Sequence, residues 1–137
     1  MTATVPTLPV LTPLNEFFWT AGREGHLSIL RCGDCGAWLH PPAPVCPECL
    51  GRNLAPQRVS GVGVVETFTI NYQAWSPGVE VPYVIAIVSL RECPQVHLTT
   101  GIVGIAGDDV RIGMPVRVQF EQHEDVWLPL FAPAGPA

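Results

Sequence analysis

The segment CGDCGAWLHPPAPVCPEC, residues 32–49, contains four of the five cysteines of this 137-residue chain. These cysteines form two Cys-x-x-Cys pairs with ten residues between them, Cys32 with Cys35 and Cys46 with Cys49. A segment of about 25 residues is too small to bury a hydrophobic core, and domains of this size usually rely on metal ions or disulfides. These four side chains therefore decide how this part of the chain folds.

The spacing of the two pairs predicts a metal site. Each Cys-x-x-Cys turn directs both sulfurs at one ion, and four thiolates in a tetrahedron are what Zn²⁺ accepts in closed structural sites. We therefore expect Cys32, Cys35, Cys46 and Cys49 to bind one structural Zn²⁺ in a zinc ribbon. Two disulfides are the alternative, and they fit a cytoplasmic chain poorly. An iron site of the rubredoxin kind is a second alternative, because tetrahedral sulfur ligation alone does not separate iron from zinc.

A closed four-thiolate site has no open position for water or substrate, so the expected zinc is structural and not catalytic. The fifth cysteine, Cys93, is followed by His97 and could form a nucleophilic dyad with it. We favour an incidental loop thiol, because no third orienting group is apparent in the sequence. The chain also lacks the Gly-x-Ser-x-Gly, phosphate-loop and dinucleotide-binding motifs. We expect no catalytic residue on this chain.

The charge balance argues against nucleic acid as a partner. The chain has seven arginines, no lysine and twelve acidic residues, and its formal net charge is −5. The arginines are spread from Arg23 to Arg117 without a cluster, whereas nucleic-acid binders present a basic stripe. The longest apolar run, residues 81–90, is too short to span a membrane. No charged residue precedes Glu16, so we expect no secretory signal and a cytoplasmic protein.

A short helix is predicted after an extended arm at residues 1–11. Thr12 is the expected N-cap, with Pro13 at the first helical position. Apolar residues recur after it at the spacing of one helix face, at Leu14, Phe17, Phe18 and Ala21. Trp19 lies off that face, so it either packs flat on its own domain or contacts another chain.

The chain after Cys49 has the pattern of short β-strands, and its 15 prolines and 13 glycines favour turns over long helices. Five strands are predicted, at residues 62–72, 82–90, 96–106, 116–120 and 126–131. In the first strand, one face is expected to hold Val62, Val64, Phe68, Ile70 and Tyr72. The second strand is apolar on both faces, which predicts a fully covered central strand.

These elements predict a mainly β protein. We expect an N-terminal helix, a rubredoxin-like zinc ribbon and a five-stranded antiparallel barrel of the OB-fold type, because no helical pattern is long enough for βαβ crossovers. The expected division is 1–28 for the arm and helix, 29–56 for the zinc ribbon, 57–131 for the OB-fold and 132–137 for a C-terminal tail.

A resemblance to a known family extends over nearly the whole chain, from Leu14 to Phe131. It is carried by the aromatic run of the leading helix, by the two cysteine turns with their neighbours and by short motifs of the barrel. These are Phe17-Phe18-Trp19, Leu30-Arg31-Cys32, Cys35-Gly36 with Trp38 and Pro41-Pro42, Cys46-Pro47-Glu48-Cys49, Gly61 with Gly63-Val64, Pro82-Tyr83, Arg111-Ile112-Gly113-Met114-Pro115-Val116 and Leu128-Pro129-Leu130-Phe131. In this combination the chain resembles the zinc-ribbon plus OB-fold proteins found beside thiolase-like enzymes of acyl-CoA metabolism.

The resemblance implies a non-catalytic accessory subunit. Family members look like partners of thiolase-fold acyltransferases and of retro-aldolases that shorten steroid side chains, and some are assembled with enoyl-CoA hydratases. The implied partner is a thiolase-like or hydratase subunit in a hetero-oligomer, with acyl-CoA as the ligand that the OB domain helps to bind or channel. The leading helix and the ribbon are implied to dock on the partner, which places Phe18 and Trp19 in the contact.

Three further residues are candidates for partner or ligand contact. Trp75 stands beside the turn sequence Ser76-Pro77-Gly78, which favours an exposed ring. Arg58 and Arg91 are candidates for CoA phosphates, which require cations. Two other classes of function remain open. One is a nucleic-acid-binding module, since OB-folds and zinc ribbons both serve in that role, and the other is a rubredoxin-like electron carrier.

Overall fold

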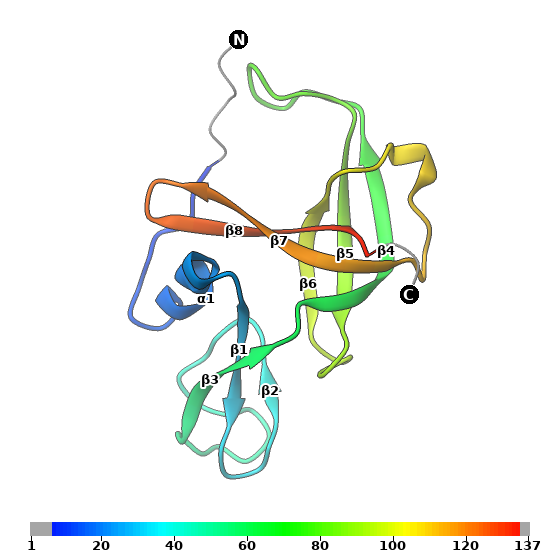
Figure 1. Cartoon of the computed structure of the whole chain (residues 1–137). Coiled ribbons are helices and arrows are strands. Elements are labelled where there is room, and N and C mark those ends of the chain that lie inside the picture. Colours follow the sequence, from blue (N-terminus) through cyan, green and yellow to red (C-terminus); the bar gives the residue numbers. More distant parts are fainter. Residues whose placement is uncertain (1–6, 135–137) are drawn as a thin grey trace.

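The computed structural model describes residues 7–134. Its N-terminal part contains helix α1 (Glu16–Thr20), the 3-10 turn η1 (Ala21–Glu24) and the strands β1 (Leu27–Cys32), β2 (Trp38–Leu39) and β3 (Leu54–Val59). The three strands form an antiparallel sheet in the order β2-β1-β3, at the bottom of Figure 1. The first cysteine pair lies at the end of β1 and in the turn after it, and the second lies in the loop between β2 and β3.

The C-terminal part is a closed five-stranded barrel. Its strands are β4 (Val62–Asn71), β5 (Tyr83–Leu90), β6 (His97–Ile102), β7 (Pro115–His123) and β8 (Val126–Pro133), and turn η2 (Gly107–Asp109) separates β6 from β7. Neighbouring strands follow the order β4-β5-β6-β8-β7, and β7 pairs back onto β4. All pairs are antiparallel except β6 with β8, which is parallel. The predicted mainly β architecture with an OB-fold is confirmed, with this one parallel pair as a detail that the prediction lacked.

Helix α1 begins later than the sequence pattern predicted. Asn15 is the N-cap residue, not Thr12. These two residues instead close the preceding turn, because the Asn15 N–H donates to Thr12 Oγ1 (3.2 Å) and the Thr12 N–H donates to Asn15 Oδ1 (2.8 Å). Phe18 is the buried residue of the helix, and it packs into the core of the barrel. The helix is therefore fixed to the barrel by this side chain.

A β-bulge in β4 changes the alternation that the sequence predicted for this strand. The ladder with β5 shifts register between Val65 and Thr67, so residues before and after Glu66 alternate in opposite phase. Val65 faces the core at 1% exposure, whereas Val64 is 38% exposed. Beyond the bulge, Phe68 packs against the core. The prediction that Val64 and Phe68 share one face is wrong, because the alternation of side chains carries no signal for the extra residue.

Strand β5 lies between β4 and β6, but one of its faces is not fully covered. Val84, Ala86 and Val88 are buried, whereas Ile85 is 38% exposed on the outside of the barrel. Ile85 lines a shallow outer groove together with Thr67 and other residues of β4 and β6. The prediction of a fully covered strand is wrong, because a small barrel encloses only one face of each strand.

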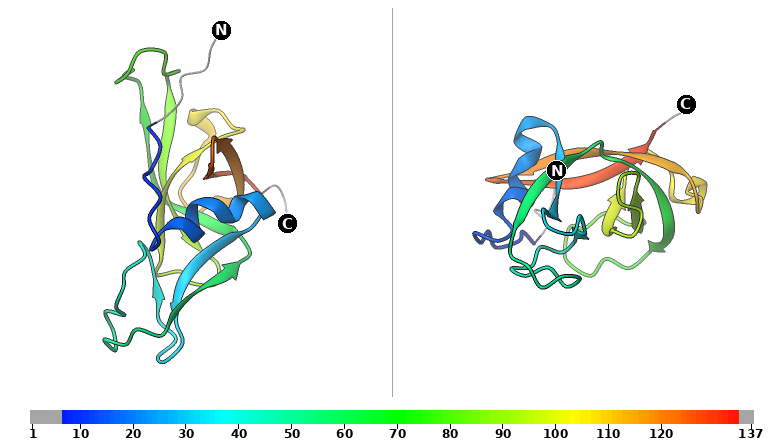
Figure 2. Two further views of the ribbon diagram at one scale, coloured as in Figure 1. Left: turned by 90° about the vertical axis from the view of Figure 1, so that its left-hand side faces the viewer. Right: turned by 90° about the horizontal axis from the view of Figure 1, so that it is seen from below.

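The ribbon and the barrel share one hydrophobic core. Helix α1 packs against β8 and β1, between the ribbon sheet and the barrel (Figure 2). The larger cluster of buried residues includes Phe18 of α1 and Leu27 of β1 together with side chains of the barrel strands. A smaller cluster, with Leu30 and Leu39, surrounds the buried cysteines, and Phe17 packs against both clusters.

The connection from the ribbon to the barrel is short and held in place. Only Ser60 and Gly61 separate β3 from β4. The Ser60 N–H and hydroxyl donate to the two carboxylate oxygens of Glu92, at 2.8 and 3.1 Å. Gly61 has a φ of 79°, and a Cβ there would lie 2.3 Å from Val118 Cγ1, so this position requires glycine.

The expected division of the chain stays a prediction. Residue 29 lies inside β1, residue 57 inside β3 and residue 132 inside β8. Residues 1–6 of the expected arm and 135–137 of the expected tail lie outside the described residues.

We predict that Gly22→Ala destabilises the fold, because η1 approaches the β7–β8 hairpin closely at this residue. A Cβ on Gly22 would lie 2.5 Å from Phe120 Cδ1 and 2.6 Å from Trp127 Cβ. This overpacking should lower the free energy of unfolding by about 1–3 kcal/mol in urea titrations followed by circular dichroism. Gly101→Ala is the control, since the nearest heavy atom to its Cβ would be 3.5 Å away. Equal losses in the two variants would contradict the close approach.

Candidate functional site

The two cysteine pairs come together in the ribbon. The Sγ atoms of Cys32, Cys35, Cys46 and Cys49 all lie within 4.8 Å of one another. The Sγ atoms of Cys32 and Cys49 are 3.6 Å apart, and so are those of Cys35 and Cys46. Tetrahedral Zn²⁺ with Zn–S bonds of about 2.3 Å requires sulfur–sulfur separations of about 3.8 Å. The cluster therefore has the dimensions of a four-thiolate metal site.

Backbone hydrogen bonds shape both cysteine turns in the same way. In the first turn the Gly36 N–H donates to the Cys32 carbonyl (3.0 Å), and in the second the Leu50 N–H donates to the Cys46 carbonyl (2.8 Å). The Gly51 N–H donates to Cys49 Sγ at 3.4 Å. The two turns are thus equivalent, and each presents its pair of sulfurs to the same point.

The chemistry of these thiols suits a metal better than two disulfides. The cysteines are free, and their 3.6 Å sulfur–sulfur distances are far longer than a disulfide bond of about 2.05 Å. Hydrogen bonds from the backbone N–H groups of Cys35 and Asp34 lower the pKa of Cys32 to about 7, which favours the thiolate. A metal held by all four sulfurs would have no open position for a reacting group.

Arg31 supports the first cysteine turn from outside. Its Nε donates to the Gly36 carbonyl at 3.1 Å, and its guanidinium lies over the ring of Trp38, 4.5 Å from the centroid. Its Nη1 donates to Gln57 Oε1 on β3 at 3.3 Å. One side chain therefore connects the turn with both neighbouring strands of the sheet.

The structure gives Cys93 the environment of a core residue. Its side chain is fully buried, and burial, followed by the neighbouring Glu92 carboxylate, raises the pKa of Cys93 to about 11. His97 is exposed at the start of β6. A protonated thiol without access to solvent is a poor nucleophile, so these observations favour the structural interpretation of Cys93.

The predicted contact residues lie in three separate places. Phe18 is buried, and Trp19 packs beside it edge to face, with ring centroids 4.8 Å apart. Trp75 is 75% exposed in the loop after β4. Arg58, near the end of β3, and Arg91, directly after β5, are exposed at the opposite end of the β4–β5 hairpin. Strand β4 extends over roughly 30 Å, so Trp75 and the two arginines do not share one site.

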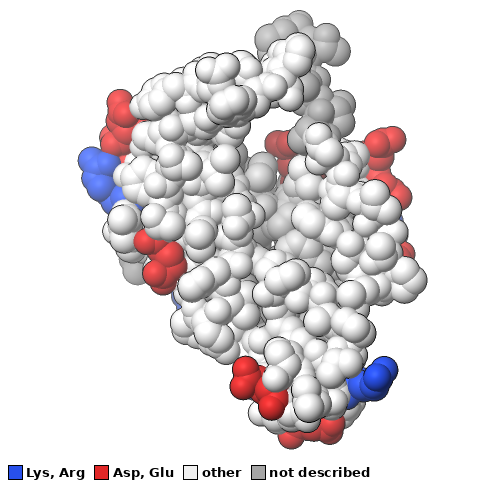
Figure 3. Space-filling model, turned by 180° about the vertical axis from the view of Figure 1, so that it is seen from behind, with Lys and Arg blue, Asp and Glu red and all other residues white. Residues whose placement is uncertain are grey.

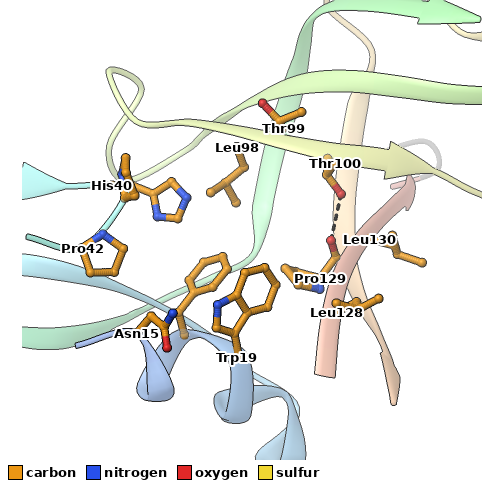
Figure 4. Close-up of a pocket in the computed structure, with 12 residues that line it drawn as sticks. Asn15, Trp19, His40, Pro42, Leu98, Thr99, Thr100, Leu128, Pro129 and Leu130 are labelled. Carbon is orange, nitrogen blue, oxygen red and sulfur yellow. Dashed lines mark hydrogen bonds between the residues drawn. The ribbon is translucent and has the colours of Figure 1, made fainter. Parts of the chain in front are cut away.

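The structure contains a pocket that the sequence analysis did not predict. It has a volume of about 400 Å³ and lies between α1, the segment after β2, and the strands β6 and β8 (Figure 4). Phe18 and Trp19 line it together with His40, Leu98, Leu130 and other residues. These segments are far apart in the sequence, so no local pattern could have indicated the pocket. The sequence analysis named two segments of its lining, Pro41-Pro42 and Leu128-Pro129-Leu130, but only as motifs of the family resemblance.

Much of one face of the molecule carries few charges. Figure 3 shows it from the β4–β5 hairpin at the top to the ribbon at the bottom, with acidic and basic side chains gathered toward its margins. This distribution agrees with a chain of net charge −5 that contains no lysine. Among the described residues, no helix is long and apolar enough to cross a membrane.

The fold and the four-cysteine cluster define a zinc-ribbon plus OB-fold protein. Two family models match in the same order: the ChsH2 rubredoxin-like zinc ribbon domain at residues 19–55 and the ChsH2 C-terminal OB-fold domain at residues 56–121. The chain therefore belongs to the ChsH2 family, as the resemblance indicated.

Known relatives are subunits of acyl-CoA hydratases and of an aldolase. The probable enoyl-CoA hydratase alpha subunit of Thermomonospora curvata is 36% identical over 93% of this chain and 40% of its own length. The 3-oxo-4,17-pregnadiene-20-carboxyl-CoA hydratase alpha subunit of Mycobacterium tuberculosis is 33% identical over 81% of this chain and 35% of its own length. The chain thus spans two fifths or less of these relatives. The solved Ltp2-ChsH2(DUF35) aldolase is similar at a TM-score of 0.84 and 35% identity, over 93% of this chain and 99% of the matched chain.

We predict that Cys32→Ala releases the metal and unfolds the ribbon. The substitution removes one of four ligands, and the metal supplies most of the stability of so small a unit. Elemental analysis should find about one metal per chain in the unmodified protein and far less in the variant. Cys93→Ala is the matched control, because this buried thiol is outside the cluster, and it should retain the metal. A Cys32→Ala protein with full metal content would refute the role of this residue.

We predict that Cys93 resists alkylation in the native protein. With a pKa of about 11, roughly one thiol in a thousand is ionised at pH 8, and burial blocks access to it. Iodoacetamide followed by peptide mass spectrometry should modify Cys93 only after unfolding in urea. Rapid modification of Cys93 in the native protein at pH 8 would instead support the interpretation of Cys93 as a nucleophile.

Proposed function

We propose that this chain is a non-catalytic accessory subunit that binds a thiolase-fold or hydratase partner and helps to complete the acyl-CoA site of that partner. The observation that carries the proposal is the similarity to the Ltp2-ChsH2(DUF35) aldolase over 99% of the matched chain. The four-cysteine cluster would be closed around a metal and Cys93 is buried, so neither supports a catalytic role. The chemistry is therefore assigned to the partner.

The loop after β4 offers a docking surface for this partner. Tyr72, Trp75 and Val81 are 67%, 75% and 41% exposed. The Trp75 Nε1–H donates to Asn71 Oδ1 at 3.1 Å, which holds the large ring in a defined orientation. Exposed tryptophan side chains with fixed orientation are frequent energetic centres of protein interfaces. The face in Figure 3 shows few basic side chains, which supports contact with a protein rather than with a polyanion.

Zn²⁺ is the proposed metal and acyl-CoA the proposed shared ligand. The four cysteines would hold the ion in a structural role, which matches the zinc ribbon family model. Arg58 and Arg91 are exposed cations that could meet the phosphates of CoA at the interface. Steroid side-chain metabolism is one proposed setting, since one relative is named a hydratase of a pregnadiene carboxyl-CoA. The cytoplasm is the proposed compartment, because paired metal cysteines require a reducing environment.

The other two classes of function are tested by simple measurements. A nucleic-acid-binding module should bind single-stranded oligonucleotides with a steep dependence on salt concentration, and we expect no such binding at a net charge of −5. A rubredoxin-like electron carrier should contain iron and be red. A colourless protein in which elemental analysis finds zinc excludes the electron carrier. A protein in which elemental analysis finds iron overturns the zinc assignment.

We predict that Trp75→Ala weakens partner binding by tenfold or more without loss of stability. Trp75 is mostly solvent-exposed, so its removal costs little in the isolated chain, whereas an interface centre typically contributes 2 kcal/mol or more. Binding of the tagged chain to purified thiolase-fold and hydratase subunits of the same organism would be measured by biolayer interferometry. Ile112→Ala is the control, since Ile112 is 69% exposed in the loop before β7. A chain that binds none of these subunits and leaves their activity unchanged would overturn the proposed function.

A further inference from the structure

The pocket in Figure 4 lies where β6 and β8 diverge beyond their short pairing in the closed barrel. These strands pair at a single position, Ile102 with Phe131. Farther along, Pro129 has no N–H to donate, and the Thr100 hydroxyl bridges the gap by donating to the Pro129 carbonyl at 2.8 Å. The opening beside this bridge is covered by α1 and not by another strand. The cavity of about 400 Å³ is within the range of small-molecule sites.

The walls of this pocket are free of charged side chains. Its lining consists of asparagine, threonine, histidine, proline, leucine and aromatic residues, and it includes no arginine, aspartate or glutamate. Burial lowers the pKa of His40, so its imidazole is neutral at physiological pH. An anionic ligand would therefore lose its hydration without gaining a counter-charge. The pocket is suited to an uncharged guest.

Three polar side chains at the pocket, those of Trp19, His40 and Thr99, remain available to a ligand. Among the described residues, no group hydrogen bonds to Trp19 Nε1 or to the ring nitrogens of His40. Of the other polar side chains at the pocket, Asn15 bonds to Thr12 and Val10 and Thr100 bonds to Pro129, whereas the Thr99 hydroxyl also has no hydrogen-bond partner among the described residues. Figure 4 shows Trp19 on α1 along the lower wall of the cavity and His40 at the upper left beside Leu98. A guest with an apolar body and one acceptor would match this arrangement.

The frame of the pocket is set by the core. Phe18 and Leu98, which line it, are 4% and 3% exposed and belong to the main hydrophobic cluster. The Phe18 and His40 rings are in contact, with centroids 4.8 Å apart. Because the walls are fixed by packing in the isolated chain, binding should not require a partner subunit.

We propose that this pocket binds an uncharged, largely apolar small molecule that carries a hydrogen-bond acceptor. The apolar body occupies the space between α1, β6 and β8, and the acceptor receives a hydrogen bond from Trp19 Nε1. This site is separate from Trp75, Arg58 and Arg91 but includes Phe18 and Trp19, which the family resemblance implies to contact the partner. Its assignment as a small-molecule site does not rest on the proposed function.

The test uses two ligands with the same ring system, 2-acetonaphthone as the neutral ketone and 2-naphthoate as the anion. Each is titrated into the full, metal-loaded chain, and the indole N–H signal of Trp19 is followed by nuclear magnetic resonance. We expect saturable shifts of the Trp19 signal with the ketone and affinity at least tenfold weaker for the carboxylate, because its charge is unpaired in the pocket. The Trp75 indole N–H, which is far from the pocket, is the internal control.

The hydrogen bond is tested by Trp19→Phe, which keeps an aromatic ring and removes the donor. The ketone should bind this variant about 3- to 10-fold more weakly by isothermal calorimetry, and Trp75→Phe should leave its affinity unchanged. The proposal is overturned if the ketone does not shift the Trp19 signal up to its solubility limit. It is equally overturned if the carboxylate binds as tightly as the ketone, or if a folded Trp19→Phe protein binds the ketone with unaltered affinity.

Discussion

The clustering of four cysteine sulfurs within 4.8 Å is the constraint on which the rest of the structure depends. One sulfur ends β1, and two others belong to the loop that leads into β3. The apolar cluster beside them is small, too small to hold these strands together on its own. A metal ion bound here would fix β1 against β3, and β3 continues within two residues into the barrel.

The same constraint explains why the candidate functions are distributed over the surface. Four sulfurs bound to one metal would leave no place for a reaction, so the proposed contacts with other molecules lie elsewhere. Trp75 projects from one end of the β4–β5 hairpin, Arg58 and Arg91 lie toward the other end, and Trp19 borders an internal pocket. The proposed contacts therefore lie at separate places on the chain.

The sequence predicted the parts of the fold that local chemistry determines, and missed those that depend on distant segments. Cysteine spacing and strand patterns are local, so the ribbon and the five barrel strands could be placed. The bulge at Glu66 could not, because one extra residue leaves no mark in the alternation until the partner strand is known. The exposure of Ile85 and the pocket beside Trp19 depend on how strands close and where α1 lies. Neither is encoded by any single stretch of residues.

The two-residue link at Ser60 and Gly61 has a mechanical consequence. Hydrogen bonds to Glu92 hold one side of the link, and the close approach of Gly61 to Val118 limits the other. A displacement or rotation of the ribbon is transmitted to the barrel, because the two-residue link is too short and too constrained to flex. A partner that binds the ribbon therefore also sets the orientation of the barrel.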